Sequence, residues 1–321
     1  MCKKIRGKFF VAPLVGLVTT LLSAGNSAQA LTPVTTCGQT LSVSGEYLLT
    51  RNLVCPDTGV DFNGVTITAS NVVFHLAGRS ISSTVCDLTR NISGIFVTGG
   101  LSGVRVDGGT VRGFNDGIVL SSSNSRVVGM TVTKACAFGI LGGGENNWIE
   151  ENVVTASGDG VALSPAKLTH VTANHLSGNV RAGVALSDFA DANFIEQNIL
   201  NNNGDYGIAV FNGNNTIIRN NAANRNRIGI ALLSTATRDG ATILPHRVLD
   251  NTAHGNSATG IWITGDGAPG IVRRNSVFGS GSTDMQDDTL GCVGNTWSGN
   301  TFRIDVVAGV SNGGPAVPCL R

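Results

Sequence analysis

The sequence predicts an all-β protein, and its composition gives the first reason. Of the 321 residues, 43 are glycine and 13% are charged. That charged share is about half of the quarter that is usual in globular proteins. A chain rich in Gly, Val, Ile, Thr and Asn favours short strands and turns over surface helices. The hydrophobic share of 41% excludes an intrinsically disordered chain.

The second reason is a four-residue repeat of glycine, a β-branched residue, a mostly small residue and a mostly aliphatic one. It occupies residues 94–97, 117–120, 139–142, 160–163, 183–186, 207–210, 229–232 and 260–263. Its glycines follow one another at intervals of 23, 22, 21, 23, 24, 22 and 31 residues. A period this regular is typical of a repeat architecture in which each repeat stacks on the next.

A second element with the same period lies between these tetrads, an apolar pair followed by asparagine. Its asparagines are Asn152, Asn174, Asn198, Asn220, Asn251 and Asn275. Three short strands separated by turns account for the period, and each turn of chain then forms one rung of a parallel β-helix. Rungs stack ~4.8 Å apart, and alternate residues such as Ile118 and Leu120 point inward. The 321 − 30 = 291 residues after position 30 give one solenoid of about ten to twelve rungs.

Tetrad and asparagine, recurring in phase, resemble the repeats of right-handed parallel β-helix proteins of the pectate-lyase-like (pectin-lyase-fold) superfamily. The resemblance covers roughly residues 37–305. It implies that the six asparagines stack in a sharp turn between two sheets, where their amides hydrogen-bond along a ladder. The superfamily includes polysaccharide lyases, hydrolases and epimerases, a copper-delivery family and repeats without known activity. The resemblance alone therefore does not assign a function.

Residues 1–30 have the pattern of a secretory signal. Lys3, Lys4, Arg6 and Lys8 precede an apolar run, and residues 27–30 read Ser-Ala-Gln-Ala. We therefore expect a secreted or periplasmic protein without a membrane span. Cleavage would leave 18 basic and 21 acidic groups, a net charge of 18 − 21 = −3. Nucleic acid is not an expected partner of such a chain.

The rest of the chain divides into three expected parts. An N-terminal cap with the first rung takes 31–60, the β-helix repeats take 61–283, and the last rungs with a C-terminal cap take 284–321. Caps are needed because a β-helix exposes an unpaired strand edge at each end.

Six cysteines remain after cleavage: Cys37, Cys55, Cys86, Cys136, Cys292 and Cys319. An even count in an exported chain favours disulfides. Six cysteines allow 15 pairings, and their clustering favours Cys37 with Cys55, Cys86 with Cys136, and Cys292 with Cys319. The first and third pairs would staple the end caps.

Two aspartates are the candidate catalytic residues. Asp116 and Asp159 stand immediately before the tetrad glycine, and in polygalacturonase-like relatives acids at this position protonate the leaving group and activate water. The two would be two rungs apart, about 9.6 Å at ~4.8 Å per rung. That is close to the ~6.5–9.5 Å of inverting hydrolases. However, Phe138 occupies the rung between them, and an aspartate before glycine is also an ordinary turn residue.

The outward positions of the tetrad strands are mostly small and apolar. Trp262 is among them and offers a ring for stacking on a sugar. Three aspartates at 284–291 interrupt the repeat, and they are interpreted as a solvated turn because EF-hand spacing is absent. The sequence has few Met and His residues and no recognisable metal-binding or cofactor-binding motif. We therefore expect neither a metal site nor a cofactor.

Two insertions offer further places for a site, because loops on a rigid scaffold often carry function. One insertion, 84–93, contains Asp87 and Arg90. The other, 234–246, carries three candidate binding residues, Arg238, Asp239 and His246.

Together these features predict an exported repeat protein that presents a carbohydrate-binding or envelope-binding surface, without a convincing catalytic constellation. The alternative is an extracytoplasmic polysaccharide-active enzyme, a hydrolase, lyase or epimerase, that uses Asp116 and Asp159. The partner in either case is a polysaccharide or a cell-envelope surface.

Overall fold

The computed structural model describes residues 31–57, 61–84, 87–233, 244–264, 270–289 and 294–303, and the backbone of strands 305–307 and 310–312. Residues 1–30, and therefore the predicted signal, lie outside the described residues. In the described part of the chain, no helix is long and apolar enough to cross a membrane.

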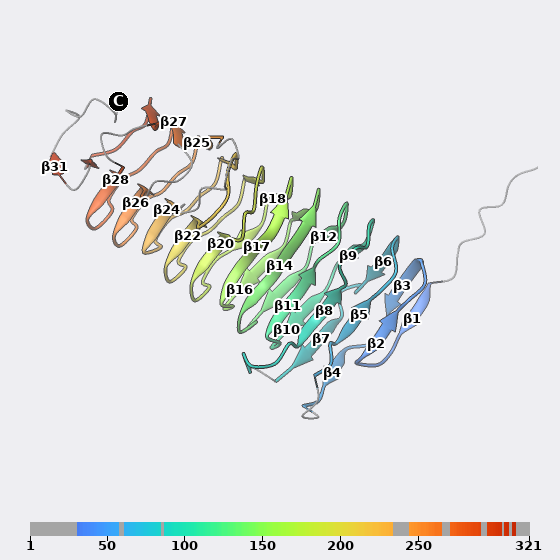
Figure 1. Ribbon diagram of the computed structural model, residues 1–321. Helices are drawn as coiled ribbons and strands as arrows, with labels where there is room; N and C mark the ends of the chain where they lie inside the picture. Colours follow the sequence, from blue (N-terminus) through green and yellow to red (C-terminus); the bar gives the residue numbers. More distant parts are fainter. Residues whose placement is uncertain are drawn as a thin grey trace, which may run out of the picture. The chain divides into compact units, whose positions relative to one another are not determined.

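Three sheets of parallel strands run through the described residues from β1 to β31 (Figure 1). Sheet A contains β1 (Thr32–Val34), β3 (Gly45–Leu49), β6 (Val72–His75), β9 (Arg105–Asp107), β12 (Arg126–Val128), β15 (Trp148–Glu150), β18 (His170–Thr172), β21 (Phe194–Glu196), β23 (Ile217–Arg219), β25 (His246–Leu249), β27 (Gly270–Arg273) and β29 (Thr296–Ser298). Sheet C contains β4 (Leu53–Cys55), β7 (Ser80–Ser83), β10 (Thr110–Arg112), β13 (Thr131–Thr133), β16 (Val153–Thr155) and β19 (His175–Leu176).

Sheet B carries the tetrads. It contains β2 (Gln39–Leu41), β5 (Val65–Ile67), β8 (Ser93–Val97), β11 (Asp116–Leu120), β14 (Phe138–Glu145), β17 (Asp159–Lys167), β20 (Ala182–Leu186), β22 (Tyr206–Val210), β24 (Ile228–Leu232), β26 (Thr259–Ile263), β28 (Thr283–Asp287), β30 (Asp305–Val307) and β31 (Val310–Asn312). Only the last pair, β30 with β31, is antiparallel among these pairings. The all-β parallel solenoid predicted from the repeat is confirmed.

Equivalent residues of successive rungs pair directly. Ile118 pairs with Ile95 on one side and with Ile140 on the other, and all three side chains are fully buried. The tetrad glycine lies at the corner between sheets C and B. A Cβ on Gly117 would lie 2.3 Å from a Val132 methyl carbon and 2.5 Å from the Gly139 carbonyl oxygen. Glycine recurs here because any side chain would collide with the core or with the next rung.

Asparagines form a ladder in the turn between sheets A and C, and all of them except the half-buried Asn300 are buried. Its members are Asn152, Asn174, Asn198, Asn221, Asn251, Asn275 and Asn300. At a typical step, Asn174 Nδ2 donates to Asn198 Oδ1 (3.0 Å) and to the Ile149 carbonyl (2.8 Å). The same Asn198 oxygen accepts the Asn174 backbone N–H (2.9 Å). Each amide therefore satisfies buried backbone groups of a neighbouring rung.

The prediction of Asn220 as a ladder member is wrong, because the ladder passes through Asn221. Asn221 is 2% exposed and its Oδ1 accepts from Asn198 Nδ2 at 3.0 Å. Asn220 is exposed and has a φ of 55°, the left-handed conformation found before other ladder positions at Glu151, Ala173, Gln197, Asp250 and Arg274. Asparagine tolerates that conformation well. The two adjacent asparagines therefore have different structural roles.

The segment around Asp284 is not a solvated turn, as the sequence was interpreted, but continues the repeat as β28. Asp284 and Asp287 are both fully buried. Asp287 accepts hydrogen bonds from Trp297 Nε1 (2.9 Å) and Asn295 Nδ2 (3.0 Å). Asp284 accepts the Ser280 and Arg303 backbone N–H groups at 3.0 and 2.9 Å. Inward carboxylates are tolerated near this end because N–H donors surround them.

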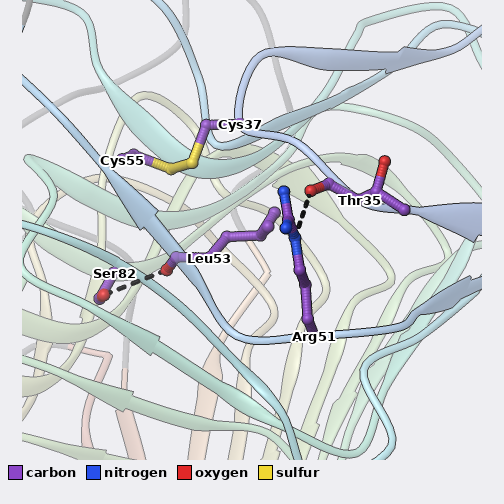
Figure 2. The surroundings of a disulfide bond; sticks show 6 residues. All are labelled: Thr35, Cys37, Arg51, Leu53, Cys55 and Ser82. Atoms are coloured by element: carbon purple, nitrogen blue, oxygen red, sulfur yellow. Dashed lines mark hydrogen bonds between the residues drawn. A yellow bond between two sulfur atoms is a disulfide. The ribbon is translucent and has the colours of Figure 1, made fainter.

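The first rungs carry the predicted Cys37–Cys55 disulfide (Figure 2). It ties the chain before β2 to the end of β4. Beside it, Arg51 Nε donates to the Thr35 carbonyl (2.8 Å). Cys136 is also disulfide-bonded. Cys86, Cys292 and Cys319 lie outside the described residues, so the other two pairings stay predictions.

The ladder can be tested by exchanging the two neighbouring asparagines separately. Asn221→Ala leaves the Ile195 carbonyl and the Asn198 amide without their buried partner, so we expect a loss of about 2–4 kcal/mol in the free energy of unfolding. Asn220→Ala is the matched control, and it should cost less than about 1 kcal/mol because Ala173 already occupies the equivalent position. Denaturant titration of both variants measures the difference. Equal losses would contradict the assignment of Asn221.

Candidate functional site

The two candidate catalytic aspartates lie in one column of sheet B. Ser93, Asp116, Phe138 and Asp159 pair in register on four successive rungs. The two aspartates are therefore two rungs apart, about 9.6 Å at ~4.8 Å per rung. The Phe138 ring belongs to the rung between them, and the Arg181 guanidinium lies 5.6 Å from its centroid.

The carboxylate of Asp159 is bound by other groups of the protein. Its side chain is largely buried, Oδ2 lies 2.7 Å from Arg181 Nη2, and Oδ1 accepts the Ala182 backbone N–H at 3.0 Å. Burial raises the pKa of Asp159, although Arg181 opposes that shift. Both carboxylate oxygens already have partners, which is the arrangement of a structural ion pair.

Asp116 is different, because one of its carboxylate oxygens is buried without a partner. The Phe138 backbone N–H donates to the carboxylate, while Oδ1 is inaccessible and makes no hydrogen bond. Burial raises the pKa of Asp116 to about 6. A carboxyl group with this pKa keeps its proton in mildly acidic solution and can donate it.

A groove of about 760 Å³ lies next to this column, along the turns that connect sheet C to sheet B. Its wall crosses six successive rungs, at Val54, Ser82, Arg112, Lys134, Ala156 and Val180. Five spacings of ~4.8 Å make it about 24 Å long. The lining includes Gly158, which directly precedes Asp159. A long groove parallel to the solenoid axis suits an extended polymer.

The groove combines exposed apolar side chains with two cations. Val54, Leu88 and Val180 are 76%, 70% and 69% exposed and all line it. Arg112 and Lys134 lie on neighbouring rungs, and neither forms an ion pair with any described residue. No carboxylate is among the described lining residues. The described lining therefore combines positive charge with exposed apolar surface.

Local sequence explains how the groove forms. Its lining includes small residues such as Gly113, Ala135 and Ser157, which leave room beside the turns. The insertion at 84–93 supplies Leu88 as a wall. Asn115 fixes that insertion, because its Oδ1 accepts the Asp87 backbone N–H (2.9 Å) and its Nδ2 donates to the Asp87 and Arg90 carbonyls. The insertion was identified from the sequence, but the other residues that line the groove were not. The only sequence signal for them is the small residues that follow several strands of sheet C.

The other predicted binding residues are elsewhere. Trp262 is half-buried, and its Nε1 donates to Asp288 Oδ2 at 2.8 Å. His246 is fully buried at the start of β25, where Nδ1 accepts the Thr216 backbone N–H at 3.3 Å. Burial lowers the pKa of His246 to about 4. The prediction of His246 as a binding residue is therefore wrong, because its ring fills a fully buried position in the first residue of the strand.

Arg238 and Asp239 lie outside the described residues, so their role stays a prediction. Among the residues that are described, no group of three or more His, Cys, Asp or Glu side chains is arranged to hold a metal ion.

Residues 93–244 match the family model for the right-handed β-helix region. No curated protein matches the chain by sequence. With the parallel register described above, the match confirms the right-handed parallel β-helix as the fold.

Several solved structures share the fold. The Dettilon tailspike protein gp208 has a TM-score of 0.65 at 16% identity, over 85% of this chain and 60% of that one. The catalytic domain of a GH87 α-1,3-glucanase in complex with nigerose has a TM-score of 0.58 at 16% identity, over 84% and 63%. A variant of the periplasmic alginate epimerase AlgG has a TM-score of 0.52 at 16% identity, over 84% and 70%. This chain thus spans 60% of the tailspike chain, and at such identities the likeness is one of fold.

The unpaired oxygen of Asp116 generates a prediction about pH. The carboxyl binds its proton more tightly in the folded state, with a pKa of about 6 against an ordinary value of 3.8. Its contribution to stability is therefore present below pH ~4 and is lost as the pH rises through ~6, by up to about 2 kcal/mol after allowing for partial exposure. Asp116→Asn removes this dependence. The melting temperature of the variant minus that of the wild type should be several degrees more positive at pH 8 than at pH 4.5, and an equal difference at both pH values would contradict the shift.

Proposed function

We propose that this protein is exported and binds an anionic polysaccharide along the groove between sheets C and B. The observation that carries the proposal is a row of three exposed apolar side chains and two cations along six rungs, where neither cation has an ion-pair partner among the described residues. Linear uronate-type chains offer carboxylates for Arg112 and Lys134 and apolar sugar faces for Val54, Leu88 and Val180. Proteins named as an alginate epimerase and an α-1,3-glucanase share the scaffold, which is compatible with a polysaccharide ligand. The basic and apolar run at the start of the chain supports export.

The binding proposal is tested by calorimetric titration with alginate and polygalacturonate oligomers, and with dextran as a neutral comparison. We expect the anionic oligomers to bind, and the double variant Arg112→Ser/Lys134→Ser to lose at least tenfold in affinity because two charge-assisted contacts are removed. Arg273→Ser, an exposed cation on the outer face of sheet A, is the matched control and should bind like the wild type. Affinity should also fall with added salt.

Two outcomes would overturn it. One is an absence of binding by any anionic oligomer to folded wild-type protein. The other is equal binding of dextran and of the anionic oligomers, with no effect of the double variant.

A second candidate function is catalysis on a polysaccharide, with Asp116 as the proton donor. It is favoured by the buried oxygen without a partner and the pKa of about 6. Asp159, whose oxygens bind Arg181 and the Ala182 N–H, would position the neighbouring rung rather than act as the base.

Incubation of the polymers with the protein in heavy water separates the two functions. New chain ends indicate hydrolysis, unsaturated ends indicate elimination, and deuterium uptake without cleavage indicates epimerisation. If Asp116 donates the proton, Asp116→Asn should lower turnover at least 100-fold, while Arg273→Ser retains it. Unchanged polymers, under conditions where a control lyase works, would exclude catalysis on them and leave binding as the function.

A further inference from the structure

A second cavity lies on the same corner of the solenoid as the groove, further along the axis. It has a volume of about 430 Å³ and is lined by Asn201, Asn224, Arg225, His254 and Gly255. These residues come from three successive rungs, whose preceding residues Ile199, Ala222 and Thr252 pair in register. None of the five lines the groove itself.

The cavity begins on the rung directly after the groove ends. Val180, the last wall residue of the groove, lies on the rung of His175. His175 pairs with Ile199, which precedes Asn201 on the next rung. The Gly178 backbone N–H donates to the Asn201 carbonyl at 3.1 Å. The six rungs of the groove and the three of the cavity therefore form one line of nine, whose eight spacings of ~4.8 Å span about 38 Å.

Hydrogen bonds to the backbone of the following rung orient the side chains along this part of the corner. Ser177 Oγ accepts the Asn201 backbone N–H (3.1 Å), and Asn201 Oδ1 accepts the Asn224 backbone N–H (3.0 Å). Asn224 Oδ1 in turn accepts the His254 backbone N–H (2.7 Å). The two Nδ2 groups have no hydrogen-bond partner among the described residues, and both are accessible to solvent. The asparagines therefore offer donors, rather than acceptors, to a ligand.

Arg225 brings a cation to the cavity at the turn position that Lys134 occupies in the groove. Both residues are exposed and have a φ of 57°, and four rungs, about 19 Å, separate them. Gly255 leaves room beside the arginine, since a Cβ there would lie 3.9 Å from Arg225 Cγ. Arg225 forms no ion pair with a described residue. No carboxylate is among the described lining residues, so the cavity, like the groove, is cationic and rich in donors.

We propose that this cavity is a further subsite for the anionic polysaccharide, and that the binding line extends from the groove as far as Gly255. This inference rests on the proposed function. Arg225 pairs with a carboxylate of the polymer, while the Asn201 and Asn224 amides donate to carboxylate or hydroxyl oxygens. A chain already bound in the groove reaches the cavity as an intramolecular contact, so the cavity adds affinity for long chains only.

The test is calorimetric titration of the full chain with polygalacturonate oligomers of four to twelve units. Arg225→Asn should lower the affinity for the longest oligomers at least fivefold and leave that for the shortest unchanged. Asparagine is the matched replacement, because Asn202 occupies the equivalent position on the preceding rung with a φ of 58°. The reverse change, Asn202→Arg, places a cation between the groove and the cavity and should raise the affinity for the longest oligomers at least threefold. Arg273→Ser should bind every oligomer like the wild type.

The outcomes separate the extension from the groove itself. If the four-unit oligomer binds and is weakened by Arg112→Ser/Lys134→Ser, while Arg225→Asn behaves like Arg273→Ser at every length, the extension is overturned and the proposed function stands. An equal loss at all lengths in Arg225→Asn also overturns it, because the cavity would then not act on long chains alone. An absence of binding by every oligomer overturns both proposals. Melting temperatures show that each variant is folded.

Discussion

Equivalent residues of successive rungs lie one strand spacing apart, ~4.8 Å, and the rest of this structure depends on that short distance. Every inward side chain contacts the equivalent side chain on the next rung. Each inward position therefore needs a residue type that packs against, or hydrogen-bonds with, another residue of the same kind. Aliphatic columns such as Ile118 with Ile140 meet that condition by packing. Asparagine meets it by hydrogen bonding, because one amide oxygen accepts both the backbone N–H and the side-chain N–H of the preceding ladder residue, as Asn198 does for Asn174.

The same constraint confines variation to outward positions and insertions. An isolated inward polar residue would have an unsatisfied group, which costs about 1–3 kcal/mol. Asp287 escapes that cost because Asn295 and Trp297 donate to it. Outward residues also lie beside their equivalents, as the stacked rings of Trp148, His170 and Phe194 show, but solvent can satisfy their polar groups. On this outer surface the chain places Arg112 and Lys134 on adjacent rungs, and neither has an ion-pair partner within the described structure. Functional differences between such solenoids therefore belong to their outer faces.

The sequence predicts what is periodic. Tetrads, register and most of the asparagine ladder follow from one repeat length, since each position is defined by its offset. Asn220 was mistaken for Asn221 because two adjacent asparagines fit the composition, and only the offset from the buried Ile218 distinguishes them. His246 resembled a functional residue because nothing in the local sequence indicates that the first residue of this strand is buried. The groove was missed because its walls come from six rungs and an insertion, whose contacts no local pattern encodes.

The rungs that line the groove continue into two long strands of sheet B, β14 and β17. The rung that presents Lys134 to the groove continues through β14 to Glu145, and the rung after it runs from Ala156 through β17 to Lys167. Their inward residues, Ile140 and Val161, are fully buried. Close packing leaves these strands no room to shift independently. The groove is therefore pre-organised by the core beneath it, because its lining cannot shift without moving these packed strands.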